Sequence, residues 1–166
     1  IGVEPLMGVT GPTSNAKYDA RQMNWLFSAA KEVPVVVAWH TAPIKSFADL
    51  TTREMLVGSS GVATSDAVYP RVMNTLLDTK FKIIDGYKDN PQLLMATEGG
   101  EIMGRAGWFV SSLLSTQGAE VEQGKQRVIV QVALEKHPRF PNVPLVAEFL
   151  KDPVKLEQLR FALSWL

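Results

Sequence analysis

The chain has 166 residues, no cysteine, and equal numbers of acidic and basic side chains, 17 of each. Its length allows one ordinary hydrophobic core. The missing cysteines exclude disulfide bonds, thiolate nucleophiles and zinc–thiolate sites, and the balanced charge gives no footprint for a nucleic-acid partner. The longest apolar run, 33–39, is interrupted by Pro34 and is too short to cross a bilayer, so no direct membrane insertion is expected.

The first part of the chain carries turn residues but no sustained hydrophobic period. Gly2, Pro5, Gly8 and Pro12 fall close together near its start. Because glycine and proline favour turns over regular elements, residues 1–24 are predicted to form an arm or loop segment. One helical turn is predicted within 20–30.

The central part of the chain alternates between strand-type and helix-type segments. Strands are predicted over 35–39, 55–57, 81–84, 101–105 and 127–132. Helices are predicted after Ser46 as N-cap, from about residue 65 to about 79, from Asn90 as cap with Pro91 at the first position, and over 108–115. Strands that alternate with helices predict an α/β fold with a mostly parallel sheet and helices on both faces.

The last segment, 151–166, is predicted to be a helix. Leu156, Leu159, Leu163 and Leu166 recur at helical spacing. Such an apolar stripe needs a surface to pack against. We therefore expect this helix to be truncated or to pack on a lobe outside the chain, and the α/β ligand-binding lobe itself is predicted over 25–150.

The stretch 58–66, Gly-Ser-Ser-Gly-Val-Ala-Thr-Ser-Asp, follows the second predicted strand and leads into a helix. Unpaired N–H groups and the positive end of a helix dipole suit a carboxylate or a phosphate. The alternative is a plain helix entry in which Thr64 or Ser65 caps the helix. The stretch is no P-loop, because no Gly-Lys-Ser/Thr follows, and it lacks the Gly-x-Ser-x-Gly spacing of a nucleophile elbow.

Polar side chains fall at the carboxyl ends of three predicted strands: residues 59–60, Tyr87 and Arg105. Ligands of open α/β sheets bind beyond these ends, so the three loops are expected to converge on one edge. The planar guanidinium of Arg105 could hold a carboxylate. The alternative for Arg105 is a structural ion pair with Glu101 or Asp85. The Tyr87 hydroxyl could meet a polar ligand group or rest at the surface.

Three further side chains have an ordinary structural explanation beside a functional one. Trp108 could cover a ligand or pack in the core. His40, at the end of a strand, is more typical of a satisfied boundary histidine than of a cleft residue, and His137 lies in a loop pattern. A hydrolase arrangement of Ser60, a histidine and Asp66 is formally open, but no spacing supports it.

Four segments in order resemble the extracytoplasmic receptors of tripartite tricarboxylate transporters. Residues 58–65 resemble the Gly-Ser-Ser-Gly-x-Gly-Ser loop of that family, and 86–88 its Pro-Tyr-Lys-Gly turn. Residues 99–102 are similar to its Gly-Gly-Gln-Val-Asp segment, and 140–148 to its Leu-Pro-Asp-Val-Pro-Thr-Val-Ala-Glu stretch. The resemblance runs from about residue 25 to about residue 150.

The resemblance implies a two-lobed periplasmic binding protein of the type II fold, of which this chain resembles the second lobe. Such a receptor clamps a small organic carboxylate between its lobes and delivers it to integral-membrane permease subunits. The resemblance therefore implies no catalytic residue, no metal and no cofactor. It also implies a periplasmic location, and the first lobe is expected to lie outside this chain.

Carried onto this chain, the family's ligand loop corresponds to a set of residues with Tyr87 at the neighbouring loop: Ser59, Ser60, Ala63, Thr64 and Ser65. Three positions depart from the pattern. Ala63 replaces the second glycine, and Gly86 stands where the family has proline. Asp66 adds an acid near the expected anion site, which favours a hydroxylated or cationic ligand group. Arg105 falls where the family varies, so it is expected to set specificity.

Two functions of other classes stay open from the sequence. One is a hydrolase or transferase that uses Ser60 as nucleophile. The other is a sensor or interaction module built on the same lobe, in which a partner buries the leucine stripe of 156–166.

Overall fold

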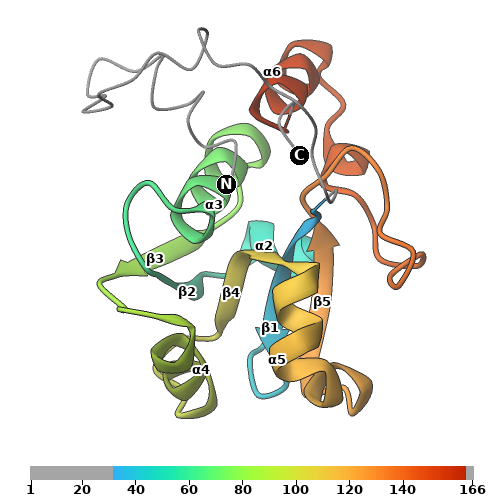
Figure 1. Ribbon diagram of the computed structural model, residues 1–166. Coiled ribbons are helices and arrows are strands. Elements are labelled where there is room, and N and C mark those ends of the chain that lie inside the picture. Colours follow the sequence, from blue (N-terminus) through green and yellow to red (C-terminus); the bar gives the residue numbers. More distant parts are fainter. Residues whose placement is uncertain (1–31, 164–166) are drawn as a thin grey trace, which may run out of the picture. The chain divides into compact units, whose positions relative to one another are not determined.

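The computed structural model describes residues 32–163. The predicted arm over 1–24, the helical turn within 20–30 and residue Leu166 of the leucine stripe lie outside these described residues. Five strands form one sheet in the order β3-β2-β4-β1-β5 (Figure 1). Their bounds are β1 Pro34–Trp39, β2 Met55–Ser59, β3 Phe81–Asp85, β4 Gly104–Phe109 and β5 Gln126–Gln131.

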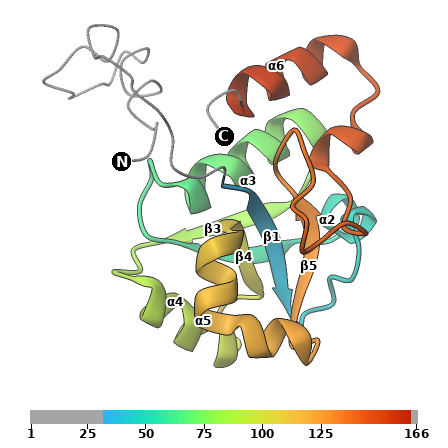
Figure 2. The ribbon, with the colours of Figure 1, turned by 45° about the vertical axis from the view of Figure 1, so that its right-hand side comes forward.

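Helices cover both faces of the sheet. They are α2 Phe47–Thr52, α3 Ser65–Leu77, α4 Asn90–Glu98, α5 Val110–Glu122, the short 3₁₀ helix η2 Val146–Phe149, and α6 Pro153–Leu163. Helix α3 lies on one face, and α4 and α5 lie on the other (Figure 2). Among the helices of residues 32–163, none has the length and apolar character to cross a membrane. The predicted α/β fold is confirmed.

The sheet is mostly parallel, with β1 as the exception. Strand β2 runs parallel to β3 and β4, whereas β1 is antiparallel to both of its neighbours, β4 and β5. The reason lies in the connection after β1. Helix α2 has six residues and spans about 9 Å, less than half of the roughly 20 Å of a six-residue strand. The connection over residues 40–54 does not cross back over the sheet, and β2 starts at the edge where β1 ends.

The core is built around β1, an interior strand of the sheet between β4 and β5. All six residues of this strand are buried, as expected for a strand with a neighbour on each side and helices on both faces. Helix α6 belongs to the same packing unit, because it contacts α3 and because Leu159 and Leu163 are fully buried among the described residues. Leu156 is only half-buried.

Two element boundaries differ from the sequence prediction. Strand β4 runs over Gly104–Phe109 instead of 101–105, and α5 runs over Val110–Glu122 instead of 108–115. The strand contains two glycines and no β-branched residue, so its own sequence carries a weak strand signal. The cap of α4 is also shifted by one residue: the Asp89 carboxylate accepts from the Gln92 N–H at 3.0 Å, so Asp89 and not Asn90 is the N-cap. The predicted cap Ser46 of α2 is confirmed.

Candidate functional site

The loops that follow β2 and β3 meet at the carboxyl edge of the sheet. The two strands run parallel in register, from Met55 opposite Phe81 to Ser59 opposite Asp85. Past this point the N–H groups of Gly86 and Tyr87 both donate to the Ser59 carbonyl, at 3.2 and 3.3 Å. The structure thus brings the loop of residues 59–66 and the turn at 86–87 together through their backbones.

The loop of residues 59–66 folds around the carboxylate of its own last residue. One Asp66 oxygen, Oδ2, accepts from the Ser60 N–H at 3.2 Å and from the Ser60 hydroxyl at 3.3 Å. The other, Oδ1, accepts from the Ser59 hydroxyl at 3.3 Å and from the Thr64 hydroxyl. Asp66 stands at the second position of α3, where the helix dipole favours a negative charge. The donors predicted for an anion therefore hold an anion of the chain itself.

Arg105 completes the surroundings of this carboxylate. Its Nη2 lies 3.6 Å from Asp66 Oδ2, and both side chains are almost fully buried, with 6% and 5% of their surface exposed. Burial lowers the pKa of the Arg105 guanidinium to about 10, and the attraction of Asp66 offsets part of that shift. Arg105 thus stays charged at neutral pH. Its ion-pair partner is Asp66, and not Glu101 or Asp85 as the structural alternative expected.

A β-bulge at Gly107 aligns Arg105 with Trp108. Along β1, Val36 pairs with Ala106 and Val35 pairs with Trp108, so Gly107 is the extra residue of β4. Residues three apart on a regular strand face opposite sides, whereas the bulge puts Arg105 and Trp108 on the same side. The guanidinium carbon lies 4.2 Å from the centre of the indole ring, a cation–π contact. Trp108 itself is buried.

Arg71 on α3 fixes the outer side of the loop. Its Nη1 donates to the Val62 carbonyl at 2.6 Å, and its Nη2 lies 3.4 Å from Asp85 Oδ2 at the end of β3. Reasoning from the sequence missed this residue, because an arginine in the second turn of a helix carries no signal of which groups it contacts. It also left Asp85 with the wrong partner.

Tyr87 turns its side chain away from the loop of residues 59–66. The ring packs with Leu93 and Ile102 in a small core cluster, and its hydroxyl donates to Glu101 Oε1 at 2.7 Å. Burial, together with this contact to Glu101, raises the pKa of Tyr87 to about 12. Only the backbone of Tyr87 therefore borders the loop.

The outer rim of the loop keeps donors without partners. No hydrogen bond within residues 32–163 engages the N–H groups of Ser65 and Asp66, which open helix α3, and none engages the Ser65 hydroxyl. Thr64 is the N-cap residue, and its hydroxyl bonds to the Gly61 carbonyl at 2.6 Å. Ala63 and Ser60 are exposed beside this rim.

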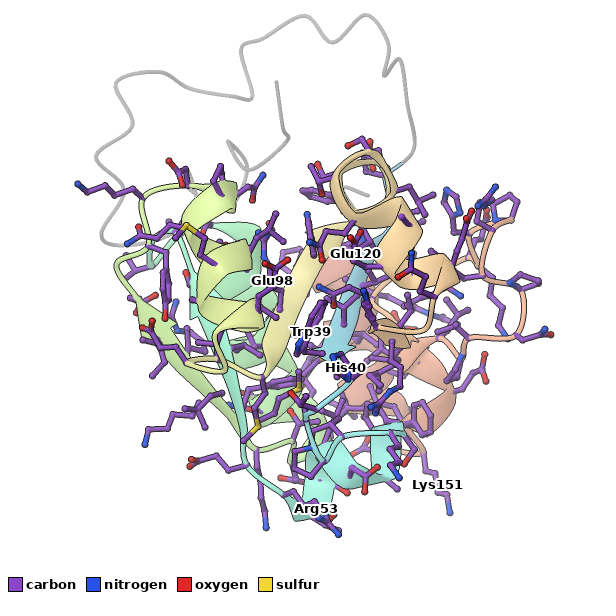
Figure 3. The ribbon with its side chains drawn as sticks, turned by 90° about the horizontal axis from the view of Figure 1, so that it is seen from below. Trp39, His40, Arg53, Glu98, Glu120 and Lys151 are labelled. Carbon is purple, nitrogen blue, oxygen red and sulfur yellow. The ribbon has the colours of Figure 1, made fainter. Side chains whose placement is uncertain are left out.

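The histidines do not join Ser60. Figure 3 shows His40 next to Trp39 at the end of β1, on the side of the molecule where Glu98 and Glu120 are also seen. Because β1 runs antiparallel to β4, this is the edge opposite Ser60. His137 Nδ1 accepts from the N–H of Arg139 at 3.2 Å.

The hydroxyl of Ser60 thus faces a carboxylate, without a histidine in hydrogen-bond contact in the described part of the chain. No group of three or more histidine, aspartate or glutamate side chains in that part is placed to hold a metal ion.

No protein-family model and no curated protein matches the sequence. Solved structures do match it. An R. palustris protein solved with adipate aligns with a TM-score of 0.59 at 15% identity, over 80% of this chain and 50% of that one. A TctC solute binding protein from Polaromonas, without ligand, gives 0.58 at 15% identity, with 80% and 51% covered. MatC from Rhodopseudomonas palustris with bound malate gives 0.55 at 17% identity, with 80% and 51% covered.

This chain has the fold of half a TctC-type solute-binding protein. The resemblance to tripartite tricarboxylate receptors predicted from four short segments is thereby confirmed at the level of the fold. The chain spans about half the length of each solved structure described above. The loop of residues 59–66 and the turn at 86–87 lie at the carboxyl ends of β2 and β3. Arg105 was predicted at the carboxyl end of a strand as well, but it is the second residue of β4, because this strand starts at Gly104 and ends at Phe109.

Proposed function

We propose that this chain is one ligand-binding lobe of a periplasmic receptor for a small organic carboxylate, which passes its ligand to permease subunits in the membrane. The observation that carries the proposal is the loop of residues 59–66, whose hydroxyl and N–H donors hold a carboxylate, that of Asp66. Two of the solved structures with this fold contain a dicarboxylate, adipate in one and malate in the other.

The ligand carboxylate is proposed to dock on the outer rim of the loop. The free N–H groups of Ser65 and Asp66 and the Ser65 hydroxyl supply donors there, and the dipole of the 13-residue helix α3 adds a favourable field. Ser60, Ala63 and Thr64 border the same rim, while Ser59 and Arg105 lie beneath it. Tyr87 contributes through its backbone, since its hydroxyl is bonded to Glu101.

The buried charges are compatible with an anion at the rim. The Arg105 guanidinium lies 3.6 Å from the Asp66 carboxylate, so the two charges offset each other close to the rim. An approaching ligand anion therefore meets the helix dipole without a net negative charge beneath it. Each hydrogen bond to the ligand's charge contributes about 1.5–3 kcal/mol, so two or three give millimolar binding or better even to a single lobe.

Amide resonances of residues 60–66 test this proposal when isotope-labelled chain is titrated with adipate and with malate. We expect saturable shifts confined to this loop and to the start of α3, and no shifts with the uncharged analogue 1,6-hexanediol. Ser65→Ala removes one rim donor and leaves the buried contacts intact, so it is expected to weaken binding about tenfold. If the amide chemical shifts of residues 60–66 do not change with either dicarboxylate at millimolar concentration, the proposal is contradicted.

A further inference from the structure

The Asp66 carboxylate is crowded by donor groups. The N–H and hydroxyl of Ser60 both reach Oδ2, and Arg105 Nη2 lies 3.6 Å from the same oxygen. The hydroxyls of Ser59 and Thr64 reach Oδ1, although each can also donate its one proton to the Gly61 carbonyl. The Asp66 side chain keeps only 5% of its surface exposed. A hydroxyl or ammonium group of a ligand therefore finds little space there, which argues against the ligand class that the acid at position 66 favoured in the sequence.

Arg105, in contrast, has more donors than residues 32–163 supply acceptors. Within these described residues its buried Nε and Nη1 atoms have no hydrogen-bond partner, and the same holds for the indole Nε1 of Trp108. The contact that Arg105 does make, at 3.6 Å, is longer than the 2.7–2.9 Å of a charge-assisted hydrogen bond. A buried guanidinium with free donors beside a crowded carboxylate indicates a site built for an anion.

We propose that Ser59, Ser60, Thr64 and Arg105 form a carboxylate cradle that the chain fills with its own Asp66, and that Asp66 thereby keeps free carboxylates out of it. This inference goes beyond the proposed function, which places the ligand on the outer rim. In this proposal Asp66 occupies the cradle as part of the chain itself. Arg105 makes the cradle selective for a negatively charged group.

The donor set selects a carboxylate over other groups. The Arg105 guanidinium is positively charged and, like the Ser60 N–H, can only donate, so an ammonium group in the cradle would meet a like charge. The donors fall in two sets, one on each oxygen of a planar group: those of Ser60 and Arg105 on Oδ2, those of Ser59 and Thr64 on Oδ1. A tetrahedral phosphate carries two further oxygens for which these contacts provide no donor.

Removal of the occupant tests the cradle. In Asp66→Ala the side chain is shortened to a methyl group, which leaves room for a free carboxylate among the same donors. We expect acetate to raise the melting temperature of this variant along a saturable binding curve. The wild type needs at least about tenfold more acetate for the same rise. Acetamide, a neutral molecule of similar shape, and chloride at equal ionic strength are expected to have no such effect.

Two variants separate the cradle from general effects. Asp49→Ala is a matched control, because the Asp49 carboxylate also accepts N–H groups ahead of a helix, from Lys45 and Ser46 at 2.9 Å, but has no buried arginine beside it. Acetate is expected to leave its melting temperature unchanged. In Asp66→Ala with Arg105→Gln, the acetate response is expected to be lost. An equal response of Asp49→Ala, or of the double variant, overturns the proposal.

If Asp66→Ala does not fold in chloride, recovery on refolding is measured in acetate and in chloride at equal ionic strength. Folded protein recovered in acetate alone supports the cradle, and no recovery in either salt contradicts it. The result is separable from the receptor proposal, which is tested with dicarboxylates on the wild type. Acetate binding to Asp66→Ala with no dicarboxylate binding to the wild type would leave the cradle standing and remove the receptor function.

Discussion

Tyr87 illustrates how a side chain at a loop can belong to the core. Its ring occupies space that Gly58 leaves open: a Cβ at Gly58 would come 3.0 Å from the Tyr87 ring and 2.4 Å from Leu93. The hydroxyl then reaches Glu101, on the segment before β4. The sequence analysis placed Tyr87 correctly next to the loop of residues 59–66. The sequence could not show that the missing side chain of Gly58, on the adjacent strand, leaves space in the core for the Tyr87 ring.

The first prediction concerns this hydroxyl. Tyr87→Phe is expected to lower the free energy of unfolding by about 1.5–3 kcal/mol at neutral pH, because it removes one hydrogen bond to a charged group. The pKa of Tyr87 rises from 10.0 to about 12 on folding, so the contribution is complete below pH 10 and is lost as the pH rises towards 12. Urea unfolding of both proteins across this range checks it. A stability difference that stays constant from neutral pH to pH 12 contradicts it.

Strand β4 shows why the elements around the site were harder to predict than the others. The strands rich in valine and isoleucine were located closely, since β1 and β5 begin and end within one residue of the predicted bounds. Strand β4 depends on what surrounds it. A Cβ at Gly104 would lie 2.1 Å from the Val37 carbonyl oxygen, so close packing against β1 selects glycine there. The same pairing creates the bulge that no local pattern specifies.

The second prediction concerns the bulge. Gly107 has φ +83°, and a Cβ there would lie 2.4 Å from the Ser65 carbonyl oxygen. Gly107→Ala is therefore expected to cost about 2–4 kcal/mol, from backbone strain and from displacement of α3. Gly118→Ala directly follows the kink of α5 at Gln117, and the added methyl meets no atom within 4 Å beyond its chain neighbours and the helix's own nearby backbone. It is therefore expected to change stability by less than about 1 kcal/mol. Chemical denaturation compares the two, and equal effects of the two substitutions would contradict the bulge.

At the scale of the whole molecule, the α/β class and the edge that carries the loops were predictable. The order of strands and helices and the turn residues between them sufficed for both. The pairing of Asp66 with Arg105 was not, since these residues lie on different elements and become neighbours only when α3 packs on β4. The position of the Asp66 carboxylate inside its own loop therefore became visible only in the three-dimensional structure.

The third prediction concerns α6, which the sequence assigned to a surface outside the chain. Leu159 is fully buried within residues 32–163, so Leu159→Ala is expected to cost about 2–5 kcal/mol. Val154 on the same helix is 64% exposed, and Val154→Ala is expected to change stability by less than about 0.5 kcal/mol. Urea denaturation measures both. If Leu159→Ala costs no more than Val154→Ala, α6 is not part of this core, and the domain boundary predicted at residue 150 gains support.

The place of β1 inside the sheet has a consequence for folding. Among the described strands it comes first in the chain, yet its hydrogen-bonding partners β4 and β5 end at Phe109 and Gln131. Until both have formed, the β-branched run of β1 has unpaired edges. Unpaired strand edges in a folding intermediate promote aggregation, so refolding of this chain is expected to lose yield as the protein concentration rises.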